Sequence, residues 1–306
     1  MVSPNDRLRL PPPWITPAAG MPDREVRPVI IVQRRRLLYP AYVQDYLDRV
    51  TAADVAAGNT SGLEFGVTDG ANTFIQDLVS DTYLGVSGGV ISQAASVIKA
   101  SPIMAGARTR LGAMTPLVGS APTSFNFVDG DYNRKTGLVG DGSTKYLNSN
   151  RNNNADPQNN RHLAAYANLT SSGNQLLAGG RSFDGVGATL LGWSGTQPLF
   201  RCIPNTDTLQ LSGSASVGTA TLFGFSRNNG SNYTARVSGS SASISSTSAT
   251  PNNINLFIFA QNNQNIAPST LSNARFAFYS IGESLDLALL DARVTALINA
   301  YAAAIP

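Results

Sequence analysis

Apolar residues recur at the period of an α-helix between Pro40 and Pro102. Three stretches each place their apolar residues on one face: Val43, Tyr46, Leu47 and Val50; Phe74, Ile75, Leu78 and Val79; and Ile91, Ala94, Ala95 and Ile98. Positions three and four apart share one side of a helix, and a proline such as Pro40 suits the first turn. The pattern predicts three helices in a small helical module over residues 40–115.

After Pro116 the helical period disappears, and short apolar runs alternate with turn signals at intervals of about ten to fifteen residues. The runs are residues 146–147, 163–169, 175–177, 188–193, 199–203, 208–211, 220–225, 233–237, 254–260 and 275–281. Pairs such as Asp184-Gly185 and Asn229-Gly230 supply the positive φ that tight turns need. This spacing leaves no room for βαβ helices and predicts a mainly β domain over residues 116–306, a jelly-roll sandwich.

The last segment of the chain predicts a helix over about residues 284–303, with Ser284 as its cap and Asp286 at its positive end. Its apolar stripe consists of Leu287, Leu290, Val294, Leu297, Ile298 and Tyr301. A stripe of this width must cover an apolar surface, either on the sandwich or on a neighbouring subunit.

Residues 1–39 predict an extended, Pro- and Arg-rich arm. Eight of the 17 prolines lie in residues 1–40, and prolines exclude both a helix and a central strand. A disordered tail is the alternative, but the apolar content of the arm argues against it. The residues predicted to attach the arm to a partner are Trp14, Ile30, Ile31, Arg34, Arg35 and Arg36.

The polar residues of the chain are mostly uncharged. Charged residues make up 13% of the chain, whereas Ser, Thr, Asn and Gln account for 90 of its 306 residues. Such a surface is typical of extracellular β proteins, viral coats and adhesins, and unusual for a cytosolic enzyme. One cysteine and one histidine exclude disulfide frameworks and Cys/His zinc sites within the chain. The net charge of +3 is too small to predict a nucleic-acid partner. No apolar run reaches 18 residues, so a membrane partner is not predicted either. No motif indicates a cofactor.

Candidate catalytic groups are sparse. A polysaccharide-degrading enzyme normally needs paired carboxylates, but residues 163–282 contain only Asp184 and Asp207, in separate turn-like contexts. No G-x-S-x-G motif accompanies His162, so a hydrolase triad is not predicted. The segment from Asp129 to Asn133 imitates the start of a calcium loop but lacks its later ligands, and a polar turn is the preferred interpretation.

Sugar binding by a lectin-like sandwich depends on an exposed aromatic ring helped by amide side chains. Trp193, Tyr233 and Asn229 are the candidates for such a carbohydrate site. Burial of Trp193 in the core is the competing interpretation.

Three segments resemble tailed-bacteriophage structural proteins that carry a concanavalin A-like, laminin-G-like jelly roll. They are LLYPAYVQDYLDRVTAA at residues 37–53, FVDGDYNRKTGLVGDGSTKYLNSN at residues 127–150 and ARFAFYSIGESLDLALLDARVTALINA at residues 274–300. The resemblance implies a non-enzymatic virion protein, either a head decoration or a tail-fibre or baseplate appendage. Its implied partners are other virion proteins of the capsid or tail, further copies of itself as a homo-oligomer, most plausibly a trimer, and host-surface glycan. The alternative is a polysaccharide-degrading enzyme on the same fold.

Overall fold

The computed structural model describes residues 39–195, 197–206, 210–211, 213–264 and 267–306. Residues 1–38, which hold nearly all of the predicted arm and its attachment residues, lie outside the described part. The described residues from Tyr39 onward form one compact unit. The helices are α1 (Ala41–Ala56), α2 (Phe65–Ser80), α3 (Arg110–Ala113) and α4 (Leu287–Ala304), with short 3-10 helices η1 (Asp129–Asp131) and η2 (Asn153–Ala155).

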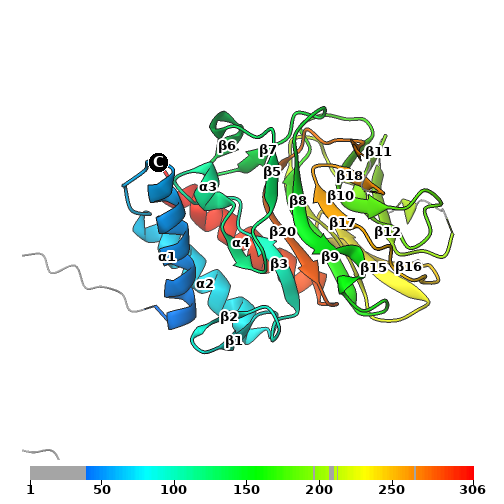
Figure 1. Cartoon of the computed structure of the whole chain (residues 1–306), viewed down its shortest axis with the longest axis horizontal. Coiled ribbons are helices and arrows are strands. Elements are labelled where there is room, and N and C mark those ends of the chain that lie inside the picture. Colours follow the sequence, from blue (N-terminus) through cyan, green and yellow to red (C-terminus); the bar gives the residue numbers. More distant parts are fainter. Residues whose placement is uncertain (1–38, 196, 207–209, 212, 265–266) are drawn as a thin grey trace, which may run out of the picture. The chain divides into compact units, whose positions relative to one another are not determined.

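Two curled sheets of nine strands each form a jelly-roll-like sandwich (Figure 1). The first sheet consists of β5 (Thr123–Phe125), β8 (Tyr146–Asn152), β10 (Gln175–Arg181), β11 (Thr189–Ser194), β12 (Gln197–Cys202), β13 (Gln210–Leu211), β17 (Asn255–Ile258), β18 (Gln261–Asn263) and β19 (Ala267–Ser269). The second consists of β3 (Ile98–Pro102), β4 (Pro116–Val118), β6 (Tyr132–Asn133), β7 (Gly137–Val139), β9 (Arg161–Asn168), β14 (Ala220–Arg227), β15 (Asn232–Val237), β16 (Ser240–Ser245) and β20 (Arg275–Gly282). A separate hairpin joins β1 (Gly85–Ser87) to β2 (Val90–Ser92).

The central strand β9 is apolar on both faces because each face is covered. Leu163 and Ala165 belong to the core between the two sheets, whereas Ala164 and Tyr166 belong to a second core shared with the helices. Successive side chains of a strand point to opposite faces, so a strand between two apolar layers needs a continuous apolar run. This burial explains the sequence HLAAYA.

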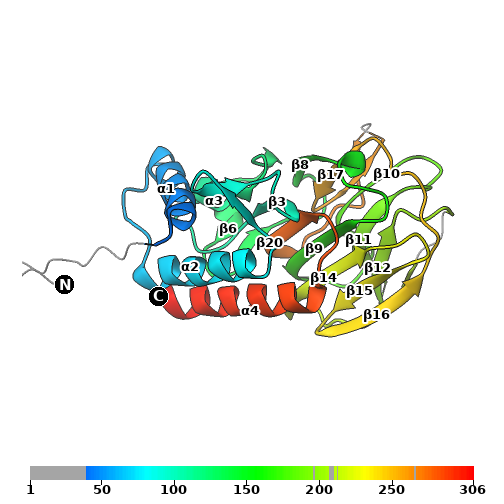
Figure 2. The same cartoon turned by 90° about the horizontal axis from the view of Figure 1, so that it is seen from below.

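Helix α4 lies along the outer face of the second sheet, with α2 beside it (Figure 2). Small residues let the two helices approach closely. A Cβ atom added at Gly66 would lie 2.7 Å from the Ala304 Cβ, and one at Gly70 would lie 3.2 Å from the Ala300 Cβ. Larger residues at these positions would push α2 away from α4 and open the second core.

The predicted mainly β fold is confirmed, and each of the ten predicted apolar runs overlaps a strand. The predicted third helix is wrong. Residues 90–92 and 98–102 are strands, and the segment between them is a turn in which the Ser96 hydroxyl donates to the Ser92 carbonyl and accepts from the Gly85 amide. Local side-chain hydrogen bonds of this kind compete with helix formation. Strand β3 belongs to the second sheet, so residues 40–115 contribute to the sandwich as well as to the helical layer.

The predicted C-terminal helix is present, but it begins later and is capped differently. Asp286 is the cap, and its carboxylate accepts from the amides of Ala288 and Leu289. Ser284 instead donates to Asn160. Helix α4 is long and apolar enough to span a membrane, yet most of its stripe is buried against the second sheet and α2 of its own chain. Most of the stripe therefore packs within its own chain, in the core that the second sheet shares with the helices.

Candidate functional site

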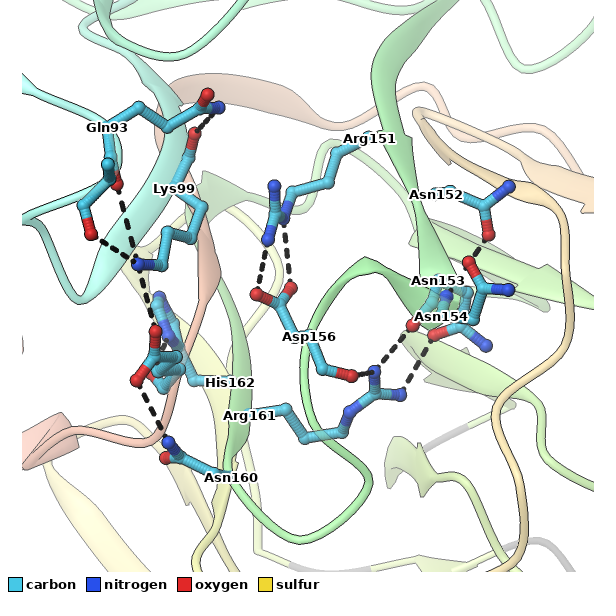
Figure 3. Close-up of polar contacts among 12 residues, drawn as sticks. Gln93, Lys99, Arg151, Asn152, Asn153, Asn154, Asp156, Asn160, Arg161 and His162 are labelled. Atoms are coloured by element: carbon cyan, nitrogen blue, oxygen red, sulfur yellow. Dashed lines mark hydrogen bonds and ion pairs between the residues drawn. The ribbon is translucent and has the colours of Figure 1, made fainter.

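A group of interacting polar side chains lies between β8, β9 and the end of β20 (Figure 3). Arg151 forms an ion pair with Asp156, in which Nε donates to Oδ2 at 2.9 Å. Arg161 donates to the Asn153 side chain at 3.1 Å and to the Asp156 carbonyl at 3.0 Å. These four residues, together with His162, Glu283 and Lys99, are called the polar cluster.

His162 is fully engaged within the polar cluster. Its Nδ1 lies 2.5 Å from the Glu283 carbonyl and its Nε2 lies 2.9 Å from the Ser280 hydroxyl. A carbonyl only accepts, so Nδ1 carries the proton and Nε2 accepts from Ser280. Burial lowers the pKa of His162 to about 4, and the imidazole is neutral at pH 7. The Glu283 carboxylate is paired with Lys99 at 2.9 Å, which lowers its pKa.

The polar cluster holds the structure together and leaves no space for a substrate. The cavity among Asn153, Arg161 and His162 measures about 10 Å³. That volume is close to the minimum for one water molecule. Arg161 donates to the Asn153 and Asp156 carbonyls of the loop, which would otherwise be buried without partners, whereas Arg151 binds the Asp156 carboxylate. We therefore assign the cluster to the stability of the loop between β8 and β9.

The structure does not bring the predicted carbohydrate residues together. Trp193 is 4% exposed, and its indole donates to the Gly195 carbonyl at 2.8 Å. Tyr233 is 1% exposed and lies in the core under the Arg227 guanidinium. Neither ring presents a face to solvent, so the prediction that they stack on sugar is wrong, and the competing interpretation of core burial is correct for Trp193. Asn229 lies in the turn after β14, where its side chain accepts from two backbone amides of the turn.

The other candidate groups are turn residues or lie outside the described part. Asp184 is held in an exposed turn by the Ser182 hydroxyl, and Asp207 is not among the described residues. In the calcium-like segment, Asp131 accepts from the Val128 amide and from Lys145. Within the described ranges, no group of three or more His, Cys, Asp and Glu side chains lies close enough to hold a metal ion. The predicted attachment residues are all within residues 1–38.

Strands β5, β8 and β17 are neighbours at one side of the first sheet (Figure 1), and each carries one of three aromatic residues, Phe125, Tyr146 and Phe257. The ring centroids of Phe125 and Tyr146 are 4.4 Å apart with planes inclined by 4°, and those of Tyr146 and Phe257 are 4.9 Å apart with planes inclined by 34°. Leu147 and Ile258 point into the core, so their neighbours Tyr146 and Phe257 face outward. We call Phe125, Tyr146 and Phe257 the aromatic row.

Sequence reasoning did not identify the aromatic row. Phe125 lies in the three-residue strand TSF, which is too short to show a pattern, and its partner Tyr146 is 21 positions further along the chain. Phe257 lies much later in the chain and reaches β8 only through the pairing of β17 with β8. The one local signal is the alternation of β8 and β17, which places an aromatic residue beside a buried Leu or Ile.

No protein-family model matches the chain, and no curated protein sequence matches it. Among solved structures, a mutant Trypanosoma rangeli sialidase with trans-sialidase activity is 12% identical, with a TM-score of 0.43, over 76% of this chain and 39% of its own. A mutant NanB sialidase from Streptococcus pneumoniae is 11% identical, with a TM-score of 0.38, over 44% and 24%. The binding domain of botulinum neurotoxin DC in complex with rat synaptotagmin II is 12% identical, with a TM-score of 0.36, over 53% and 41%. The chain thus spans less than half the length of each of these proteins.

Proposed function

We propose that this protein is a non-enzymatic structural component of a tailed-phage virion that carries a lectin-like domain for host-surface glycan. The main support is that two of the segments that resemble phage structural proteins meet in the fold. Strand β7, within residues 127–150, pairs with β20, within residues 274–300, so that Leu138 lies opposite Phe276 and Val139 opposite Arg275. The two segments therefore form neighbouring strands of the second sheet, and α4 follows β20 directly in the chain.

The carboxyl groups favour a binding or structural role over a polysaccharide-degrading enzyme. A glycoside hydrolase needs a carboxylic acid whose pKa is raised so that it can protonate the leaving group. Among the described carboxyl groups, those with clearly shifted pKa values are all lowered: Glu64, Asp141, Asp184 and Glu283. Such groups remain ionised at neutral pH and are poor proton donors.

In this proposal residues 1–39 attach the protein to the particle. Copies of the chain assemble into a homo-oligomer, which we propose is a trimer. The arm combines apolar side chains such as Trp14 and Ile30 with the basic run at residues 34–36. Covering a large apolar side chain on a partner contributes roughly 1.5 to 3 kcal/mol before the cost of ordering it. Since α4 is covered by its own chain, the contacts between copies come from other surfaces.

Deletion of residues 1–36 tests the attachment. The truncated protein is expected to fold with an unchanged circular dichroism spectrum and melting temperature, because the described core begins at α1. It is expected to be missing from particles assembled in cells that lack the full chain. Electron microscopy of these particles, beside particles with the full chain, gives the position and copy number. Normal decoration by the truncated protein would show that the anchor lies elsewhere.

A hydrolysis assay separates this proposal from the enzyme alternative. The full chain is expected to release no reducing sugar from host-surface polysaccharide. Turnover that disappears in Asp184→Asn or Asp207→Asn would establish the alternative.

A further inference from the structure

The aromatic row is the most exposed group of mutually contacting aromatic rings in the described part of the chain. Phe125 is 36% exposed, and Tyr146 and Phe257 are half-buried. Phe125 and Tyr146 are direct cross-strand partners, and β5 is the last strand of the main strand order on that side of the first sheet. The ring of Phe125 is thus supported on one face by Tyr146, while none of the described strands flanks its other side.

The surface around the row carries amides and hydroxyls instead of charges. Strands β5, β8 and β17 contain one charged residue, Arg151, and its guanidinium is paired with Asp156. Thr123, Asn148 and Phe257 are aligned across the three strands by their register. Asn148 uses its side-chain oxygen to accept from the Asn150 amide, which leaves its two N–H donors available. The Tyr146 hydroxyl and the Asn255 side chain make no hydrogen bond to any described residue.

These features determine the chemistry of a matching ligand. An aromatic face carries negative charge density and attracts the C–H groups of a flat, partly apolar ring. Free amides and a phenol hydroxyl bind neutral hydroxyl groups, whereas a carboxylate or phosphate ligand is normally met by Arg or Lys. A pyranose ring without charge has both an apolar C–H face and a rim of hydroxyls.

We propose that the aromatic row, with Asn148 and Asn255, is the site at which this protein binds a neutral oligosaccharide, through stacking of a pyranose ring on Phe125. This inference rests on the proposed glycan-binding function and names its site and ligand class. Cross-strand aromatic contacts also stabilise a sheet. The site therefore has to be tested by binding as well as by stability.

The experiment titrates the full chain with cellohexaose, maltohexaose and chitohexaose as neutral probes and with 3′-sialyllactose as an acidic probe, by calorimetry and saturation-transfer NMR. At least one neutral probe is expected to bind, and 3′-sialyllactose is not. Phe125→Ala is expected to weaken binding roughly tenfold, the effect of losing one contact of about 1.4 kcal/mol. Tyr146→Phe keeps the ring and the packing, and is expected to weaken binding by a smaller factor through loss of the hydroxyl.

Phe183→Ala is the matched control, because Phe183 is 86% exposed in a turn and lies outside the row. It is expected to bind as the unmodified chain does. If Phe125→Ala does not fold, Phe125→Leu keeps an apolar side chain but removes the flat ring, and its binding is measured instead. Binding unaffected by both the Phe125 and Tyr146 changes would overturn the site while leaving glycan adhesion intact. No binding of any probe would overturn both the site and glycan adhesion, whereas virion incorporation is tested separately by the arm deletion.

Discussion

The single histidine of the chain makes the stability of the protein depend on pH in a defined window. His162 is 2% exposed, and burial lowers its pKa from 6.5 to about 4 in the folded chain. Between these pH values the unfolded chain binds more protons than the folded one. The contribution of neutral His162 is therefore fully present above about pH 6.5 and is lost as the pH falls through about 4.

The size of the effect follows from the pKa difference. At about 1.4 kcal/mol for each pH unit, the folded protein loses about 3 kcal/mol of unfolding free energy across the window. The structural reason is specific: protonated Nε2 can no longer accept from the Ser280 hydroxyl, and a charge appears among buried residues. The charged groups that act on the imidazole, Asp156 and Arg151, are already paired with each other and compensate little.

Urea unfolding of the full chain at pH values from 4 to 7.5 measures this loss. His162→Gln serves as the reference, because glutamine can donate and accept hydrogen bonds but does not titrate. The difference in unfolding free energy between the two proteins is expected to shrink as the pH falls from 6.5 to 4. The imidazole resonance of His162, the only histidine signal, is expected to titrate near pH 4. A difference that does not change with pH, or titration near 6.5, would refute the reasoning.

Three further predictions concern stability. Arg227→Met removes hydrogen bonds to the Cys202 and Ser246 carbonyls and is expected to lower the unfolding free energy by about 3 kcal/mol in urea titrations. Gly137→Ala places a Cβ atom 1.8 Å from the Phe276 carbonyl oxygen at a φ of +92°, so its melting temperature is expected to fall well below that of Gly130→Ala, which meets nothing within 4 Å. Asp286→Ala removes the α4 cap and is expected to cost about 1 kcal/mol in thermal unfolding, whereas Asp286→Asn retains most of it.

Ten strands of the sandwich can be predicted from the sequence because their inward residues are apolar and their turns contain glycine or asparagine. Strand β16, with the sequence SSASIS, escapes prediction because Ile244 is its only buried residue and the strand lies at a sheet edge. The predicted helix near Ala94 and Ala95 is wrong because its apolar residues match the period of a helix by coincidence. These residues lie in two short strands and in the turn between them. Gly85 packs directly against Ala95, and this contact between distant positions cannot be read from the local pattern.

The candidate site depends on long-range pairing, which a single sequence does not reveal. Trp193 and Tyr233 have the residue types of a sugar-binding site, but their strands turn them toward the core. Phe125 and Tyr146 come together only through the register of β5 and β8, and Phe257 joins them through the pairing of β8 with β17. Exposure and register, rather than residue type, decide which aromatic rings can meet a ligand.

The burial of the α4 stripe within its own chain also has a consequence for the kinetics of folding. Each chain buries most of the α4 stripe in its own second core, so the folding of α4 does not depend on a second chain. Refolding is therefore expected to be a first-order process whose rate does not change with protein concentration, unlike that of fibres whose subunits fold only as they intertwine. Each chain can then fold before it meets a partner, and assembly becomes a separate, later step.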